Sequence, residues 1–213
     1  MAGRESRIRN GADMPRIRII FEKKEWITFV NHMDLPLIFS RAARRAGLSQ
    51  EFTQGFSPHP HMSLGPALAI GVTGLAEPAE FWFNQWKEEN YVLWNSKLPQ
   101  GLKILKCAEV DGPALAKSTT AAVYSISGTK SELGSDAENV LKDAAAKAGQ
   151  LFDSAFDCGT VVLTVGELNR CGAGCLVNAL KDSGICSGWP DVDIVRRSVG
   201  TWDTASGKVL PLI

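Results

Sequence analysis

Hydrophobic and polar residues alternate in the first patterned stretch of the chain, which predicts a β-strand at 16–21. Residues 26–30 are apolar and rich in β-forming side chains, so we expect them to be the partner strand of a hairpin. An apolar stripe with helical spacing then begins after Asp34, the expected N-cap, and ends at Gly47. The three arginines of this helix lie off the stripe and are expected to face solvent.

The rhythm of strands and helices continues to about residue 110 and then starts again. The rest of the first half has a predicted loop at 53–61, strands at 62–72, 79–86 and 102–110, and a short helix at 91–98. After a stretch rich in Gly, Pro, Ala, Ser and Thr, the second half has predicted strands at 121–127, 158–165 and 192–199 and helices at 137–148 and 173–181. Each half therefore has the order strand, helix, strand or strands, helix, strand.

This order predicts an α+β protein of two ferredoxin-like (split βαβ) units, in which helices pack on antiparallel sheets. The predicted units are 14–112 and 121–213, joined by a linker at 113–120. Residues 1–13 are polar and lack the apolar core of a secretory signal, so we set them apart as a disordered leader or added sequence.

The composition is that of an ordinary globular protein, with 45% hydrophobic and 22% charged residues and a net charge of +0. Residues 1–60 hold ten Lys and Arg against six Asp and Glu, whereas the rest hold thirteen against seventeen, so the chain can still present a basic face. No stretch reaches the roughly 18 apolar residues of a membrane span. The five cysteines are odd in number and follow no secretory signal, so we expect a cytoplasmic protein with reduced thiols and no membrane contact.

All three histidines of the chain lie between positions 32 and 61, which makes this segment the one with the most chemistry. His32, His59 and His61, together with Asp34, could supply the ligands of a divalent metal ion. The His-Pro-His spacing fixes the backbone but does not bring the two rings together. We therefore predict no metal, and name these three histidines as the candidate ligands if one binds.

A second hypothesis is acid–base catalysis, with His32, Asp34 and His59 as the candidate catalytic residues of an RNA hydrolase or nuclease that a metal could assist. A neighbouring arginine would stabilise the developing negative charge. Residue types alone do not place a substrate, so we favour a protein that is not an enzyme. No cofactor is expected.

The third hypothesis is recognition of a phosphate-bearing ligand, with RNA as the leading candidate. Arginines on a helix face and aromatic rings in a loop are the side chains that contact phosphates and stack on unpaired bases. The candidate ligand-binding residues are Arg41, Arg44, Arg45, Gln54, Gly55, Phe56, Ser57, His59 and His61. The alternative, equally expected, is a solvated helix face beside a proline-stiffened loop.

Several stretches of the chain resemble the bacterial radical-SAM-associated domain of unknown function, the C-terminal domain often linked to B12-binding radical SAM proteins. The stretches are Arg16–Phe21 (RIRIIF), Phe29–Leu35 (FVNHMDL), Arg41–Leu48 (RAARRAGL), Gln54–Leu64 (QGFSPHPHMSL) and Pro99–Leu105 (PQGLKIL). The family typically has a strand, an SHLDL-like turn, an arginine-rich helix, a QGFNPHPKISF-like loop and a PEGLEVL-like element. The resemblance is specific over 16–72, fair to about residue 110, and fades beyond it.

The resemblance implies a domain joined to, or encoded beside, a B12-binding radical SAM protein, and often near ribonuclease and ribosomal-protein genes. The motif is carried here by His32, Asp34, Arg41, Arg45, Gln54, Gly55, Phe56, Pro58, His59 and Pro60. His61 stands where the family commonly has Lys, which weakens the metal hypothesis and favours contact with phosphate. The chain lacks the C-x3-C-x2-C cluster motif, so it is not itself the radical SAM enzyme.

We therefore expect a non-catalytic RNA-binding or substrate-presenting module that assists a partner radical SAM enzyme in modifying RNA or a translation component. The alternatives are a His-based RNA hydrolase or nuclease and a protein-interaction scaffold whose exposed tryptophans dock the partner enzyme.

Overall fold

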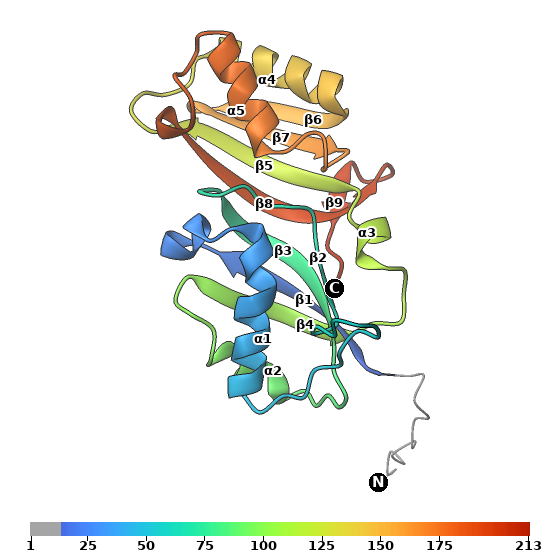
Figure 1. Ribbon diagram of the computed structural model, residues 1–213. Coiled ribbons are helices and arrows are strands. Elements are labelled where there is room, and N and C mark those ends of the chain that lie inside the picture. The colour runs from blue at the N-terminus through green and yellow to red at the C-terminus, as the bar shows by residue number, and fades with distance from the viewer. Residues whose placement is uncertain (1–13) are drawn as a thin grey trace.

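The computed structural model describes residues 14–213 and consists of one long sheet with helices packed on it (Figure 1). The predicted leader, 1–13, lies outside the described residues. The strands are β1 (Arg16–Lys23), β2 (Met62–Leu64), β3 (Thr73–Trp82), β4 (Leu102–Glu109), β5 (Ala121–Gly128), β6 (Gln150–Asp157), β7 (Thr160–Gly166), β8 (Val192–Asp203) and β9 (Lys208–Leu210). The α-helices are α1 (Leu35–Arg45), α2 (Asn90–Asn95), α3 (Leu115–Ser118), α4 (Ser135–Ala148) and α5 (Ala173–Asp182), and the 3-10 helices are η1 (Glu25–Phe29), η2 (His32–Asp34) and η3 (Trp189–Asp191).

The main path of the sheet has the strand order β4-β1-β3-β8-β5-β7-β6, with β2 paired to β3 and β9 paired to β8. Within each half every pair is antiparallel, and β3 with β8 is the one parallel pair in the described part of the chain. The order is β4-β1-β3-β2 in the first half and β8-β5-β7-β6 in the second. If the strands of each half are numbered from one to four, both halves have the order 4-1-3-2. The predicted α+β class is confirmed.

Helix α1 follows from the apolar stripe that the sequence shows. Leu35, Phe39 and Ala42 are buried against the sheet, and Gly47 ends the helix region at a φ of 75°, a left-handed value that favours glycine. Asp34 occupies the expected N-cap position, but its side chain makes no capping hydrogen bond. The Asn31 side chain instead accepts from the backbone N–H of the second residue of η2, at 3.0 Å, so a 3-10 turn precedes the helix.

Two other local predictions differ from the structure. Residues 26–30 do not form the expected strand, because η1 buries the adjacent side chains of Ile27 and Thr28, which an alternating strand cannot place on one face. Strand β6 is not predicted by the pattern, because it follows α4 after a single residue and is largely exposed. The predicted linker, 113–120, contains α3, and Leu115 in it is fully buried.

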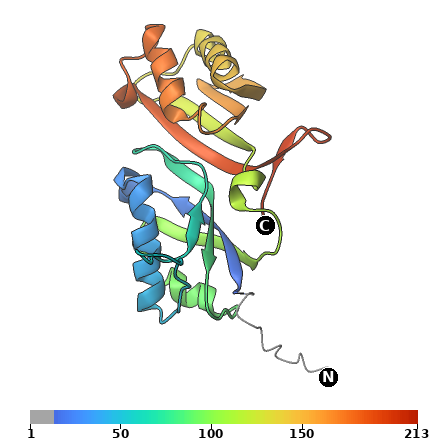
Figure 2. The same cartoon turned by 45° about the vertical axis from the view of Figure 1, so that its right-hand side comes forward.

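Each half has a hydrophobic core beneath its helices, and Leu68 and Val72 of the first half are buried in the core of the second. In the first half Trp94 is fully buried and packs edge-on against Phe39 and Phe81, with ring centroids 5.9 and 4.8 Å apart. Its indole N–H donates to the Phe39 carbonyl at 3.1 Å. The second core is mostly aliphatic. The hairpin of β8 and β9 turns back beside α3, where the Thr201 hydroxyl donates to the Ser118 carbonyl at 2.8 Å (Figure 2).

A buried ion pair joins the two halves where β3 and β8 run parallel. Arg196 on β8 is fully buried, and its Nε donates to the Glu77 carboxylate on β3 at 2.8 Å while its Nη2 donates to the second oxygen of that carboxylate. The other guanidinium N–H groups donate to the carbonyls of Pro66 and Ala67, at 2.8 and 3.1 Å, and to the Tyr124 hydroxyl at 3.3 Å. A buried charge with every donor satisfied is tolerated, whereas an unpaired one is not.

A second buried cation lies next to this pair. Lys23 on β1 has no exposed surface, and its ammonium donates to the carbonyls of Thr28 and Val30 at 3.2 and 2.7 Å. Burial lowers the pKa of Lys23, Glu77 opposes that change, and the charge of Arg196 adds to it. The joint between the halves therefore holds two cationic side chains around one carboxylate.

Replacing Arg196 with Met should destabilise the protein by roughly 3–5 kcal/mol, because it leaves the Glu77 carboxylate buried without its partner. The measurement is the free energy of unfolding in urea. The matched control is Arg197→Met, at the neighbouring exposed arginine, whose guanidinium makes one hydrogen bond to the Ser125 hydroxyl at 3.0 Å. Glu77→Gln should lower the free energy of unfolding much less in the Arg196→Met variant than in the parent protein. Equal losses for Arg196→Met and Arg197→Met would contradict the role assigned to the pair.

Candidate functional site

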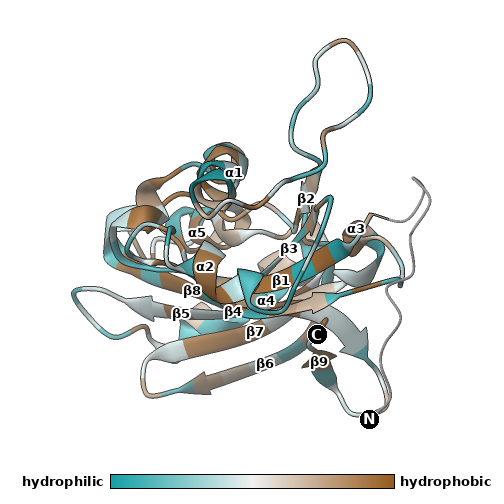
Figure 3. Cartoon of the chain, turned by 90° about the horizontal axis from the view of Figure 1, so that it is seen from below, coloured by the Kyte–Doolittle hydropathy of each residue, from teal (hydrophilic) through white to brown (hydrophobic). Residues whose placement is uncertain are grey.

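The histidine-bearing loop that leads into β2 is held as a narrow extension of the sheet. The backbone N–H of His61 donates to the Glu51 carbonyl at 2.7 Å, and that of Thr53 donates to the His59 carbonyl at 2.8 Å. Residues Phe52 and Pro60 form an isolated antiparallel bridge between these bonds. Figure 3 shows a long loop standing away from the body of the molecule next to β2, on the side of the sheet where α1 lies.

The tip of this loop exposes an aromatic ring to solvent. Phe56 is fully exposed, and the exposed fraction of Phe52 is 52%. Gln54, Gly55 and Ser57 beside them are also exposed. Gly55 has a φ of 132°, which an L-residue rarely adopts, so the turn at the tip depends on this glycine.

The two loop histidines have different surroundings. His59 is exposed, and its Nδ1 lies 3.1 Å from the Thr53 hydroxyl and 3.2 Å from the Ser57 carbonyl. His61 stacks flat on Trp82 of β3, with ring centroids 3.9 Å apart, and its Nδ1 lies 3.0 Å from a Glu51 carboxylate oxygen. His61 thus anchors the base of the loop to the sheet, whereas His59 faces solvent near the tip.

The arginines of α1 are exposed as predicted, but they are not equivalent. The Arg45 guanidinium donates to the Lys97 carbonyl at 2.7 Å, which ties α1 to the end of α2. Arg41 and Arg44 have no hydrogen bond or ion pair within residues 14–213, so their guanidinium groups are free to bind a ligand. No hydrogen bond or ion pair within the same residues joins the loop at 51–61 to α1.

His32 is separated from the other two histidines by its contacts. It is half-buried, and its Nδ1 accepts from the backbone N–H of Leu68 at 3.4 Å. Burial lowers the pKa of His32, and the nearby charge of Arg196 lowers it further. His32 therefore belongs with the buried joint, where it holds the segment that follows β2, and not with the exposed loop. Asp34 is exposed, and within the described residues its carboxylate forms no hydrogen bond or ion pair with His32, His59 or His61.

The described part of the chain offers no group of three or more His, Cys, Asp or Glu side chains arranged to hold a metal ion. His32, His59 and His61 accordingly share no ligand position. Among the cysteines, Cys171 is fully buried, and burial raises the pKa of its thiol to about 12. A thiol with this pKa stays protonated at neutral pH and is a poor nucleophile.

The structure also shows surface features that the sequence analysis did not identify. Apolar side chains at η1, η2 and the start of α1 are exposed: Trp26, Phe29, Met33 and Leu37. A cavity of about 420 Å³ lies between the end of β2, α3 and the turn after β7, and none of the predicted site residues lines it. Sequence periodicity cannot find the cavity, because it is formed by residues from separate segments. No helix among residues 14–213 is long and apolar enough to cross a membrane.

Replacing His32 with Gln should reduce the loss of stability on acidification. Because the His32 pKa is lowered from its ordinary value of 6.5, the unfolded chain binds the proton first. The contribution of neutral His32 to the stability of the fold is therefore complete above pH 6.5. It is lost as the pH falls from 6.5 toward the lower pKa of the folded state. The measurement is urea unfolding at about pH 7.5 and about pH 5.5. The matched control is His59→Gln, and an equal change of pH dependence in both variants would contradict the assignment.

Comparisons with known proteins give a family but no activity. No curated protein matches the chain. A crystal structure of a microcompartments protein from Desulfitobacterium hafniense DCB is 10% identical over 87% of this chain and 96% of that chain, with a TM-score of 0.25, which is too low to carry an argument. A family model described as "Uncharacterized protein conserved in bacteria (DUF2344)" matches residues 16–152, which include α1, the exposed loop and β2. Since this match spans more than half of the chain, the protein belongs to that bacterial family.

Proposed function

We propose that the protein is a non-catalytic module that binds single-stranded RNA, or presents an RNA substrate, for a partner radical SAM enzyme. The single observation that carries the proposal is the exposed loop, with Phe56 at its tip, on the same side of the sheet as the unpaired arginines of α1 (Figure 3). The radical SAM partner rests only on the family resemblance of the five stretches between residues 16 and 105. We also propose that each half is a ferredoxin-like unit, because its strand order and antiparallel pairing fit that arrangement.

The exposed aromatic ring supports base stacking. A Phe side chain in water gains nothing from its position, so full exposure on an ordered, hydrogen-bonded loop favours contact with a ligand. Unpaired bases stack on aromatic side chains with about 1–3 kcal/mol per base, without strong sequence preference. The His59 ring lies on the same loop and is exposed, so it offers a second flat surface or a donor.

The arginines support contact with phosphate. Arg41 and Arg44 lie one turn apart on α1, and each has a free guanidinium with a planar array of donors that matches phosphate oxygens. Arg45 is engaged with Lys97 and is the weaker candidate of the three. The His-based nuclease gains no support from the contacts, since His32 and His59 have no common partner.

Removing both free arginines should weaken RNA binding and reduce its salt dependence. For Arg41→Ala with Arg44→Ala, the slope of log affinity against log salt should fall by about 0.7 for each phosphate that an arginine no longer neutralises. Phe56→Ala should weaken binding roughly 5- to 150-fold with an unchanged slope, because the substitution removes stacking and leaves the charge unchanged. The measurement is fluorescence anisotropy with a short unstructured RNA.

The charge-matched control is Lys147→Ala with Lys181→Ala, which removes two basic groups from α4 and α5. A parent protein that binds no RNA at low salt would end the proposal. So would equal effects of the arginine pair and the lysine pair, since binding would then follow net charge only.

A protein-interaction scaffold is the second candidate, and the exposed apolar side chains favour it. The exposed fractions of Trp26, Met33 and Phe29 are 84%, 78% and 66%. Trp26 and Phe29 line a hollow of about 350 Å³ together with Thr28 and Thr73. Large exposed aromatic and Met side chains are typical of the buried centre of protein interfaces.

If this surface docks the partner enzyme, Trp26→Ser with Phe29→Ser should abolish co-purification of a co-expressed radical SAM partner and leave RNA binding intact. The control is Val92→Ser with Leu93→Ser, at two other exposed apolar side chains on α2. Retention of the partner by the first variant would contradict the scaffold hypothesis without affecting the RNA proposal.

A further inference from the structure

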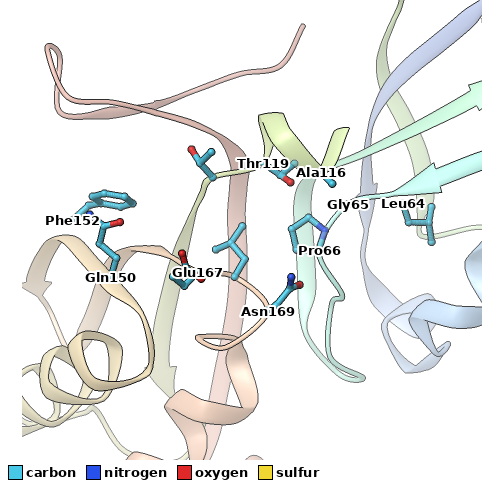
Figure 4. A pocket seen from close by; sticks show the side chains of 11 residues that line it. Leu64, Gly65, Pro66, Ala116, Thr119, Gln150, Phe152, Glu167 and Asn169 are labelled. Atoms are coloured by element: carbon cyan, nitrogen blue, oxygen red, sulfur yellow. The ribbon is translucent and has the colours of Figure 1, made fainter. Parts of the chain in front are cut away.

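The cavity of about 420 Å³ is built by four separate segments of the chain. Its walls come from the end of β2, from α3 and the residues after it, and from β6 with the turn that follows β7. Figure 4 shows Gln150, Phe152 and Glu167 on one side of the space and Pro66 and Asn169 on the other. This volume lies within the range of small-molecule sites in proteins. One wall is fixed from behind, because Arg196 holds the carbonyl of Pro66 at 2.8 Å.

Three exposed polar side chains of the cavity lack a hydrogen-bond partner within residues 14–213, and one of them is charged. Gln150, Glu167 and Asn169 have no side-chain hydrogen bond or ion pair within the described residues. Glu167 is the single charged residue of the lining, and it is exposed at the cavity with no cation among the lining residues. A ligand that fits here brings N–H donors to two carboxylate oxygens, which accept best from two adjacent donors in one plane.

The backbone at Glu167 has a conformation that is unusual for a residue with a side chain. Its φ is 51°, a left-handed value that glycine adopts more easily than any other residue. Its carbonyl accepts from the backbone N–H groups of Arg170 and Cys171, a turn that a glycine would form equally well. A Cβ atom on Gly149 would lie 2.6 Å from the Cβ of Glu167, so Gly149 leaves the room that Glu167 fills. Residues held in such conformations concentrate at functional sites.

An aromatic ring forms the second feature of the cavity. Phe152 stacks on Trp202 with ring centroids 4.3 Å apart and an interplanar angle of 14°. A Cβ atom on Gly166 would lie 3.0 Å from the Phe152 ring, so this glycine lets the edge of the ring approach the β7 backbone. A fixed ring beside free hydrogen-bonding groups is suited to a planar heterocycle.

From these contacts we infer that the cavity binds a guanine base, with the Glu167 carboxylate accepting from its N1–H and 2-amino groups. Guanine presents two adjacent N–H donors on one edge, as the carboxylate requires. Adenine presents a ring acceptor at the corresponding position, which the carboxylate would repel. The amides of Gln150 and Asn169 can donate to the base carbonyl or the ring nitrogen.

The guanine could belong to a free nucleotide or to an RNA strand. Leu64 at the cavity and Pro60 in the exposed loop are separated by four residues of extended chain, on the order of 13 Å. A strand bound at the loop could therefore place a base in the cavity. The inference does not depend on RNA binding at the loop, because a mononucleotide can fill the same site.

The test is calorimetric titration of the full chain with GMP, IMP and AMP. GMP should bind, IMP should bind roughly tenfold or more weakly because it lacks the 2-amino donor, and AMP weaker still. Glu167→Gln and Glu167→Gly should each weaken GMP binding by roughly tenfold or more. Glu167→Gly should also keep or raise the melting temperature, because glycine relieves the left-handed backbone.

The matched control is Cys158→Gly, which makes the same kind of change at another residue with positive φ, 45°, in the turn between β6 and β7. It should keep or raise the melting temperature and leave GMP binding unchanged. Uridine pentamers carrying one central guanine, inosine or adenine identify the source of the base. If RNA is the source, the guanine pentamer binds more tightly than GMP and still depends on Glu167. If a nucleotide is the source, the pentamer binds no more tightly than GMP.

Equal binding of GMP and AMP, GMP binding that survives both Glu167 substitutions, or no binding of GMP or the guanine pentamer at millimolar concentration would each overturn the inference. Arg41→Ala with Arg44→Ala should leave GMP binding unchanged. A failure of RNA binding at the loop is thus distinguishable from a failure of the guanine site.

Discussion

The buried ion pair between Arg196 and Glu77 is the interaction on which the rest of the arrangement depends. It lies at the one parallel pairing in the described sheet, and it joins two halves that each have a core, the second of which also includes Leu68 and Val72 of the first half. The same guanidinium also holds the carbonyls of Pro66 and Ala67, so the segment after β2 is fixed to β8. Because a buried charge is tolerated only when its partners are in place, the pair specifies one relative position of the two halves.

The order and class of the elements could be predicted from the sequence, whereas their junctions could not. The stripe of α1 and its end at Gly47 are local patterns, and the structure confirms both. The 3-10 helix at 25–29 was missed, because a short run of β-forming residues has no periodicity long enough to distinguish a tight turn from a strand. The partner of Arg196 across the boundary between the halves could not be identified from the sequence, since Glu77 is 119 residues away in the chain.

The candidate site shows the same limit. The histidines are neighbours in the sequence, but His32 lies by the buried joint, His61 is stacked on the sheet and His59 is exposed on the loop. The motif therefore contains two kinds of residue. Some hold the loop against the sheet, and others are exposed to solvent on the loop. The cavity residue Glu167 has no sequence signal apart from its position after a strand, because its left-handed backbone is visible only in the structure.

Because the buried ion pair joins the halves, we expect the protein to unfold as one cooperative body, in which the loop, the basic helix face and the cavity keep fixed positions. Differential scanning calorimetry of the full chain tests this claim most directly. A single unfolding transition, whose calorimetric enthalpy equals its van't Hoff enthalpy, is the result that a shared buried joint predicts. Two transitions with separate midpoints would show that the halves unfold independently, and would contradict it.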